Sequence, residues 1–285
     1  MKRIALLLLA VMLCFSLCSC DSLLKKAKAT ITGTEESKMP SDYITTLENE
    51  EYTYEIYESY VKIIKYIGTE TEVVIPTEID NKPITVIGSL CFHATDAKVT
   101  SVKISESIEE IEESAFYYMD TLTSITIPDN VVKISSRAFA WCNLLESVTL
   151  GNGITEIPEF CFNHCSKLAS ITLTDQITKI GVRAFSYCDS LIEVNIPSNI
   201  SEVGERAFES CPALEYAIFE SDEISIGDYA FDNCEKTVII ASDGSDAKEY
   251  CAENGLRWST SKDIEAVVLG KDENASSPES TDDSQ

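Results

Sequence analysis

Residues 138–150 read Ala-Phe-Ala-Trp-Cys-Asn-Leu-Leu-Glu-Ser-Val-Thr-Leu, and this stretch combines two structural periods. Phe139, the Cys three residues later and the Leu six residues later have helical spacing, which predicts a short helical turn with one buried face. Residues 147–150 alternate polar and apolar side chains, as a half-buried β-strand does. The stretch therefore predicts a compact unit in which a turn leads into a strand.

The same unit recurs along most of the chain. It is marked by seven phenylalanines, separated by 24 residues once and by 23 residues five times: Phe92, Phe116, Phe139, Phe162, Phe185, Phe208 and Phe231. A small residue precedes each of them, and a cysteine follows five of them after three residues. A unit this short cannot bury its apolar face alone, so successive units must stack as coils. Their strands then form a parallel sheet with a spacing of about 4.8 Å.

This register resembles the BspA-like, or Treponema-type, leucine-rich repeat proteins of bacterial surfaces. The resemblance extends over residues 52–258, and residues 54–88 are similar to the N-terminal portion of that family. It implies a surface-exposed protein with a role in adhesion or host interaction, and it supplies no catalytic residues. We therefore predict an α/β leucine-rich repeat solenoid, rich in β-structure. It should have seven coils of about 23 residues, a parallel sheet on one face and short helical turns on the other.

Both ends of such a stack need covering. The alternation of residues 52–66 predicts an N-terminal β-hairpin cap. At the other end, Ser245 is a suitable N-cap for a short helix that would stop at Asn254-Gly255. Ala247, Tyr250 and Cys251 of this C-terminal helical cap would face the last coil.

The N-terminus has the features of an export signal. Lys2 and Arg3 precede an apolar run over residues 4–17, which is too short to span a membrane as a helix. The following Leu17-Cys-Ser-Cys20 resembles the lipobox of bacterial lipoproteins, which implies that Cys20 becomes the lipidated N-terminus. Two or three acyl chains hold a protein at a membrane, whereas one does not. The alternative is a plain secreted protein.

These features divide the chain into four parts. We predict a lipoprotein signal peptide over residues 1–19 and a flexible tether over residues 20–50. The leucine-rich repeat domain with its caps would occupy residues 51–260. A disordered acidic tail would follow over residues 261–285, where too few large apolar residues remain to form a core.

The chain is strongly acidic, with 22 basic and 48 acidic residues and a net charge of −26. Phosphate backbones repel such a protein, so we expect no nucleic-acid partner, and membrane contact only through the lipid anchor. We also expect a monomer that requires no cofactor.

Eleven cysteines in an exported protein raise the question of disulfides. Five form a ladder at one repeat position, but the parallel side chains keep their Cβ atoms slightly too far apart for good disulfide geometry. Because Met119 takes the same slot in another repeat, we interpret these cysteines as buried free thiols. Cys161, His164 and Cys165 superficially indicate zinc, yet no fourth ligand is in evidence and we predict no metal site.

Two exposed surfaces are candidates for ligand binding. On the predicted sheet, outward positions are Ser or Thr in most repeats and then change in the last ones, where they become Glu193, Asn195, Tyr216 and Ile218. An exposed Tyr beside an exposed Ile is a plausible partner contact, although Tyr216 could instead shield the C-terminal end. An ice-binding use of the Ser/Thr rows is a weaker interpretation.

The second candidate is the position two residues after each Phe. It would present an aromatic stripe of Tyr118, Trp141, His164 and Tyr187. These rings could stack on sugars or pack on a protein. The alternative is that they only lean on neighbouring turns.

No nucleophile–base pair or phosphate loop stands out from the repeat, which indicates a protein that is not an enzyme. The sequence predicts a surface lipoprotein that binds an extracellular protein or glycan. The alternative is a structural surface spacer or capsule component without a specific partner.

Overall fold

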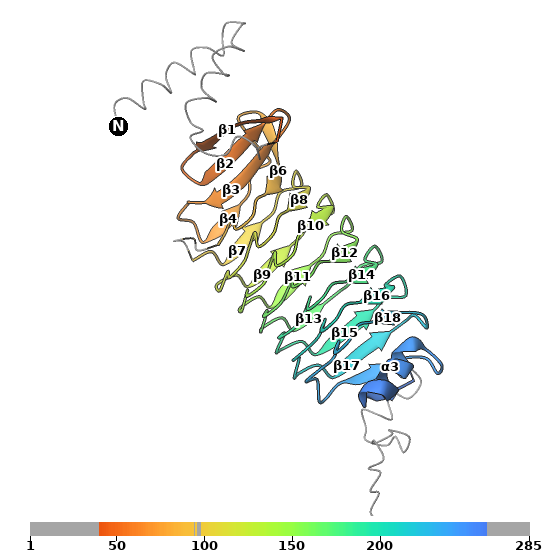
Figure 1. The fold of residues 1–285 in the computed structure, drawn as a ribbon. Coiled ribbons are helices and arrows are strands. Elements are labelled where there is room, and N and C mark those ends of the chain that lie inside the picture. Colours follow the sequence, from red (N-terminus) through yellow and green to blue (C-terminus); the bar gives the residue numbers. More distant parts are fainter. Residues whose placement is uncertain (1–39, 94, 96–97, 261–285) are drawn as a thin grey trace, which may run out of the picture.

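The computed structural model describes residues 40–93, 95 and 98–260. They form an elongated stack of coils (Figure 1). Cys20, the signal peptide, residues 20–39 of the tether and the acidic tail lie outside the described residues, so these assignments stay predictions. Within the described part of the chain, no helix is long and apolar enough to cross a bilayer.

One long face of the stack is a nine-stranded parallel sheet. Its strands, in spatial order, are β4 (Glu72–Val74), β7 (Ser101–Lys103), β9 (Ser124–Thr126), β11 (Ser147–Thr149), β13 (Ser170–Ile171), β15 (Glu193–Ile196), β17 (Tyr216–Phe219), β19 (Val238–Ile240) and β20 (Arg257–Ser259). Ser101, Ser124 and Ser147 are register partners, as the 23-residue period requires. The predicted parallel sheet is confirmed, and it has one strand beyond the seven repeats at each end.

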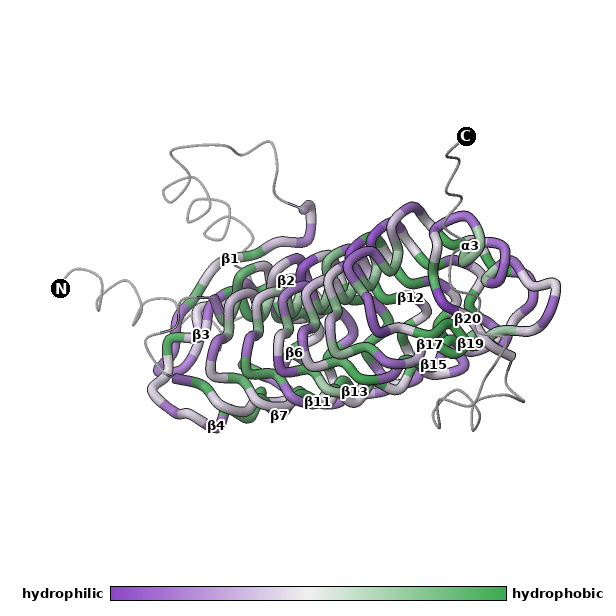
Figure 2. The backbone as a smooth tube through the Cα atoms, turned by 90° about the horizontal axis from the view of Figure 1, so that it is seen from below, coloured by the Kyte–Doolittle hydropathy of each residue, from purple (hydrophilic) through white to green (hydrophobic). Residues whose placement is uncertain are grey.

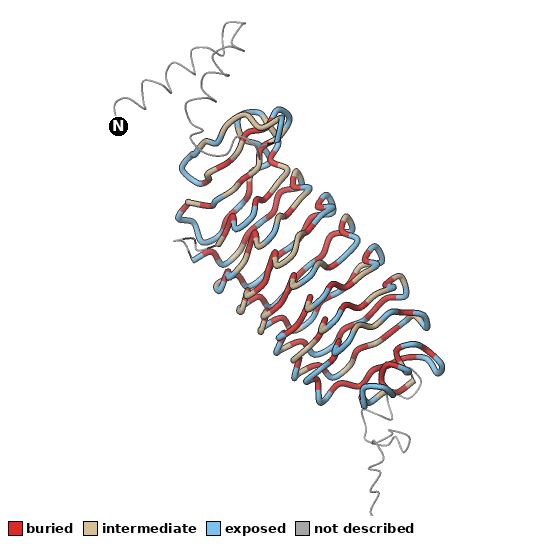
Figure 3. The backbone as a smooth tube through the Cα atoms, in the orientation of Figure 1, coloured by how far each residue is buried: buried red, intermediate tan, exposed pale blue. Residues whose placement is uncertain are grey.

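Two further sheets line a second side of the coils. The N-terminal sheet contains β1 (Tyr43–Glu48), β2 (Tyr52–Tyr57), β3 (Val61–Tyr66), β6 (Lys82–Ile87), β8 (Glu110–Ile111) and β10 (Lys133–Ile134), with β5 (Glu78–Ile79) pairing with β6. A four-stranded sheet continues it with β12 (Glu156–Ile157), β14 (Lys179–Ile180), β16 (Glu202–Val203) and β18 (Ser225–Ile226). Buried and exposed stretches recur at the same places in successive coils (Figure 3), and so do apolar ones (Figure 2).

The seven phenylalanines form one continuous column inside the stack. Neighbouring rings are nearly parallel, with centroids 4.9 to 5.5 Å apart. Tyr66 continues the column at 5.5 Å from Phe92, and Tyr250 closes it edge-on at 6.4 Å from Phe231. The extra strands at the two ends thus belong to coils in which Tyr takes the place of Phe.

The segments at both ends have the secondary structure that the sequence predicts. Strands β2 and β3 form an antiparallel hairpin, and β1 adds a third strand from within the range assigned to the tether. Helix α3 (Asp246–Asn254) has Ser245 as its N-cap and Gly255 as its left-handed C-cap, with φ of 65°. Ala247, Tyr250 and Cys251 of α3 are buried. That the two segments act as caps stays a prediction.

The prediction of helical turns is wrong. The segment around each Phe is a run of β-turns with bonds such as Leu145 N–H to Cys142 O at 3.0 Å. The N–H of Phe139 donates to the neighbouring coil, at Cys161 O, over 3.0 Å. Consecutive turns and a helix share a three-residue spacing of buried side chains. The segment forms turns and not a helix because its N–H groups bond to the neighbouring coil, and these bonds replace the bonds to residue i−4 that a helix needs.

Candidate functional site

The turn segments carry three columns of residues, two with exposed or half-buried side chains and a more buried one between them. We call this side of the molecule the turn face. Two columns have left-handed backbone, with φ between 52° and 63°. The first column lies two residues before each Phe: Leu90, Ser114, Arg137, Phe160, Arg183, Arg206 and Tyr229. The second lies two residues after: Tyr118, Trp141, His164, Tyr187, Ser210 and Asn233. Between them, directly after each Phe, lies the floor column, which includes Tyr117, Ala140, Asn163, Ser186 and Glu209.

The predicted aromatic stripe is the second column, and its rings form an ordered ladder. The centroids of Trp141 and His164 are 3.8 Å apart, those of His164 and Tyr187 are 4.3 Å apart, and Tyr118 lies 6.0 Å from Trp141. Tyr118 is 51% exposed and Tyr187 38%, while Trp141 and His164 are half-buried. The two inner rings are therefore sandwiched, and their open edges, not their faces, are what a ligand can contact.

The position of His164 between two rings affects its protonation. Burial lowers the pKa of the imidazole, and the carboxylate of Asp189 opposes this only partly. The ring is therefore neutral at neutral pH and stacks as an aromatic group.

The first column gathers arginine and aromatic side chains that the sequence reading missed. The guanidinium carbon of Arg137 lies 4.7 Å from the ring centroid of Phe160, and that of Arg183 lies 5.9 Å from it. Arg206 contacts Tyr229 in the same way at 4.8 Å. The 23-residue spacing of Arg137, Phe160 and Arg183 was visible in the sequence. The column was not recognised because its residues share a backbone conformation but differ in side-chain chemistry.

A pocket of about 240 Å³ lies between the two left-handed columns in the N-terminal half of the turn face. We call it the turn-face pocket; it is lined by Leu90, Ser114, Tyr117, Arg137, Ala140, Trp141, Phe160 and Asn163. Ala140 and Asn163, which are both buried, line it from the floor column. Trp141 thus belongs both to the predicted stripe and to the pocket.

The sheet-face candidates lie together on neighbouring strands. Glu193 pairs in register with Tyr216, and Asn195 with Ile218. Glu193 and Asn195 are exposed, whereas Tyr216 and Ile218 are half-buried. Asn195 Nδ2 donates to Glu220 Oε1 at 2.7 Å. The use of this surface as a binding site stays a prediction.

Comparison with known proteins identifies the repeat. The model of the BspA type leucine rich repeat region matches residues 85–215 in six copies. The repeats are BspA-type leucine-rich repeats. Comparison with curated proteins gives no match.

Solved structures of leucine-rich repeat proteins have the same fold. The T. pallidum protein TpLRR is 23% identical, with a TM-score of 0.50, over 75% of this chain and 98% of that one. A leucine-rich repeat protein from Eubacterium ventriosum is 24% identical, with a TM-score of 0.56, over 67% of this chain and 50% of that one. At these identities the likeness concerns the BspA-type fold.

The cysteines of the BspA-type repeats are free and buried, as predicted. Each ladder thiol donates to the carbonyl of the Phe in the preceding coil, at 3.0 to 3.4 Å, from Cys142, Cys165, Cys188, Cys211 and Cys234. Burial raises the pKa of Cys142 to about 12. Among the described residues, no group of three or more His, Cys, Asp or Glu side chains could hold a metal ion. The thiols of the repeats therefore serve packing.

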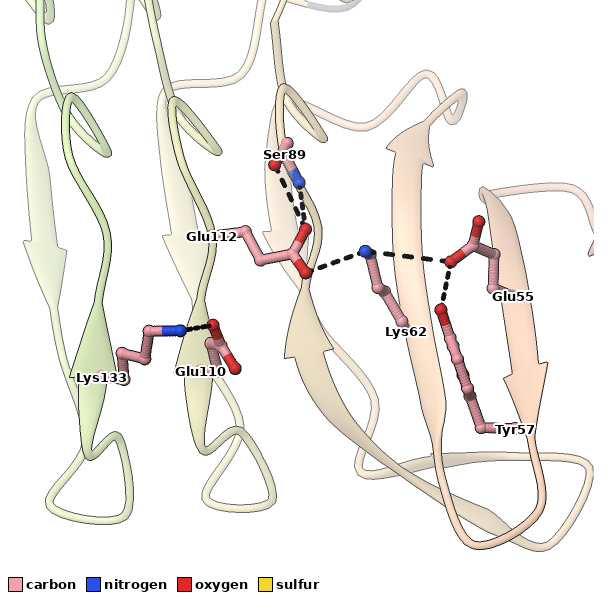
Figure 4. A network of polar contacts seen from close by, with 7 residues as sticks. All are labelled: Glu55, Tyr57, Lys62, Ser89, Glu110, Glu112 and Lys133. Atoms are coloured by element: carbon pink, nitrogen blue, oxygen red, sulfur yellow. Dashed lines mark hydrogen bonds and ion pairs between the residues drawn. The ribbon is translucent and has the colours of Figure 1, made fainter. Parts of the chain in front are cut away.

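A polar network joins the N-terminal strands to the first BspA-type repeats (Figure 4). Lys62 Nζ lies 2.8 Å from Glu112 Oε1 and 3.9 Å from Glu55 Oε2. The other oxygen of Glu112 accepts from Ser89 N–H at 2.9 Å, and Lys133 pairs with Glu110 at 2.6 Å. Because these carboxylates are already engaged, we assign the network to structure and not to ligand binding.

Proposed function

We propose that this protein is a lipid-anchored, surface-exposed binding module that is not an enzyme. Export and lipidation at Cys20 are supported by the leader and its lipobox-like motif. Binding an extracellular macromolecule is supported by the BspA-type repeats, since solenoids of stacked coils present extended surfaces to partners.

One observation carries the proposal: exposed aromatic side chains occupy left-handed backbone positions on the turn face. Bulky residues rarely adopt positive φ, and an L-residue there costs about 1–2 kcal/mol. Ser210 and Asn233 fill the same position in later coils, so the coil itself does not require a ring there. Side chains kept at unfavourable backbone positions point to a function beyond folding.

The side chains of the turn face suit binding better than catalysis. Arginine, aromatic and small residues repeat along the columns by register and do not converge on one reacting atom. Catalysis needs a nucleophile, an acid or a base held around one point. An extended surface with exposed rings and a shallow pocket is typical of macromolecular recognition.

Binding is tested by comparing two variants of the full chain. Purified protein is applied to a panel of host matrix proteins, intact cells and polysaccharides, and saturable binding is measured. We expect Trp141→Ala with Phe160→Ala to remove binding, and Glu193→Ala with Tyr216→Ala to retain it. The reverse result would move the site to the sheet face. No saturable binding across the panel would support a spacer.

Lipid anchoring is tested separately in cells fed a palmitate analogue. The wild-type chain should carry the label, and Cys20→Ala should not. Equal labelling of both would contradict Cys20 as the lipid site and move the lipid to another residue, whereas no label in either would leave a plain secreted protein.

A further inference from the structure

The turn-face pocket has an elongated shape that limits what it can hold. Its first-column wall runs from Leu90 through Ser114 and Arg137 to Phe160, one residue in each of four successive coils. At about 4.8 Å per coil, this wall is about 15 Å long. Polyproline II rises about 3.1 Å per residue, so about five residues of such a chain match the wall. An extended peptide therefore fits the pocket better than a compact ligand.

The pocket offers apolar walls together with unused hydrogen-bond donors. Leu90, Tyr117, Trp141 and Phe160 supply the apolar surface. Trp141 Nε1–H and the Tyr117 hydroxyl donate to no other described residue, and Arg137 gives one N–H to Glu113 at 3.3 Å. A polyproline II chain makes no internal hydrogen bonds, so its carbonyl oxygens are free to accept from these groups. Aromatic-lined grooves with such donors bind polyproline II segments in other domains.

The orientation of the rings argues against a sugar. Sugars stack on an open aromatic face. Both faces of Trp141 are occupied, by His164 at 3.8 Å and by Tyr118 at 6.0 Å. Arginines flank the Phe160 ring at 4.7 and 5.9 Å. What remains accessible is ring edges and N–H groups, which suit a peptide backbone.

The charges around the pocket favour a basic partner. Arg137 and Glu113 form an ion pair at 3.3 Å, so their two charges cancel. Glu159, directly before Phe160, and Asp120, two residues after Tyr118, are exposed and pair with no basic side chain among the described residues. The whole chain carries −26, which attracts a cationic segment over distance.

We propose that the turn-face pocket binds an extended, proline-containing peptide segment of a partner protein, with Lys or Arg beside the prolines. This inference rests on the proposed binding function and specifies its partner. Apolar or proline side chains lie against Trp141 and Phe160, backbone carbonyls accept from Trp141 Nε1–H and Tyr117, and the basic residues face Glu159.

The test uses the full chain as bait for a phage-displayed library of random dodecapeptides, followed by fluorescence anisotropy with the enriched peptides. We expect enrichment of sequences that combine Pro with Lys or Arg. Binding should weaken at least about tenfold in Trp141→Ala, and about fivefold in Trp141→Phe, which keeps a stacked ring but lacks the N–H donor. It should also weaken in high salt.

Tyr187→Ala is the matched control, because it removes a ring of the same ladder that does not line the pocket. It should bind the enriched peptides as the wild type does. Circular dichroism of all three variants checks that they fold, and Trp141→Phe keeps the test valid if Trp141→Ala does not.

Three outcomes would overturn the inference. They are no enrichment of peptides with Pro beside a basic residue, equal binding by the Trp141 variants, or Trp141-dependent binding of oligosaccharides on a glycan array. If the panel of matrix proteins, cells and polysaccharides still gives saturable binding, only the partner assignment fails. If it gives none, the proposed binding function fails as well.

Discussion

Two stacks of aromatic rings run along this molecule, one inside the coils and one outside. The inner column contains seven phenylalanines, each no more than 1% exposed, with centroids 4.9 to 5.5 Å apart. The outer ladder contains Tyr118, Trp141, His164 and Tyr187, with centroids 3.8 to 6.0 Å apart. The inner column has no exception in seven coils, whereas the outer one gives way to Ser210 and Asn233.

The difference separates what the fold requires from what it permits. An inner position must fill a closed space between coils, and only Phe does so in every repeat. An outer position must only adopt positive φ, which Ser, Asn and aromatic residues all do here. The same 23-residue period therefore produces one column whose residue type is fixed by packing and one whose residue type can vary, which leaves it free to serve recognition.

The largest expected effect comes from emptying the inner column. Phe162→Ala should lower the free energy of unfolding by about 3–5 kcal/mol, because it removes a fully buried ring and leaves a cavity between Phe139 and Phe185. Urea unfolding followed by circular dichroism measures this. A loss of about 2 kcal/mol or less would mean that the inner rings are as dispensable as the outer ones.

The thiols beside the inner column should make stability depend on alkaline pH. Burial raises the pKa of Cys142 to about 12 and those of Cys165 and Cys188 well above 9. The unfolded chain then binds fewer protons above pH 9 than the native one. The free energy of unfolding should be unaffected by these thiols below about pH 8, and should fall by about 1.4 kcal/mol per pH unit for each thiol above about pH 9.

Urea unfolding between pH 8 and 10 measures this slope. Cys142→Ala with Cys188→Ala should flatten it by the share of two thiols. In the native protein these cysteines should resist iodoacetamide at pH 8, as mapped by mass spectrometry. Rapid native labelling, or a slope unchanged in the double variant, would contradict a buried, neutral ladder.

The inner column was predictable from the sequence because residues buried at the same point of every coil recur at the same spacing along the chain. Phe139 and its equivalents fix the register, and the register fixes which sheet residues are neighbours, such as Ser124 and Ser147. The turn conformation was not predictable, because the spacing from Phe139 to Cys142 and Leu145 fits both a helix and a run of turns. Hydrogen bonds to the next coil determine whether a helix or a run of turns forms, and the sequence does not show these bonds.

The outer surface was predictable only in part, for the same reason. The ladder from Tyr118 to Tyr187 was visible because its members share aromatic chemistry. The column of Arg137 and Phe160 was not, because its members share only a backbone angle. That the rings present edges and not faces depends on centroid distances, which no residue pattern specifies.

A smaller effect should follow from shortening the outer ladder. Trp141→Ala should lower the free energy of unfolding by about 1–2 kcal/mol, since it removes two ring contacts from a half-buried site. The comparison with Phe162→Ala in the next coil should give a smaller midpoint shift in urea. Equal losses in the two variants would show that the outer ladder is part of the core.

The smallest effect should come from the outer position that has no ring. Ser210 has φ of 58°, so Ser210→Gly removes the cost of a left-handed L-residue but increases the entropy of the unfolded chain. It also removes the exposed hydrogen bond from Asn233 Nδ2 to Ser210 Oγ at 3.3 Å, which contributes little beside these two effects. The two contributions are about 1 kcal/mol each and opposed, and the net change should be within about 0.5 kcal/mol.

Ala207→Gly is the matched control in the same coil, because Ala207 is fully buried; it should cost more, about 1 kcal/mol. If Ser210→Gly costs as much as Ala207→Gly, then the side chain matters at this position. If it costs less, this position needs only its backbone conformation, which is what the proposed binding role of Tyr118, Trp141 and Tyr187 requires.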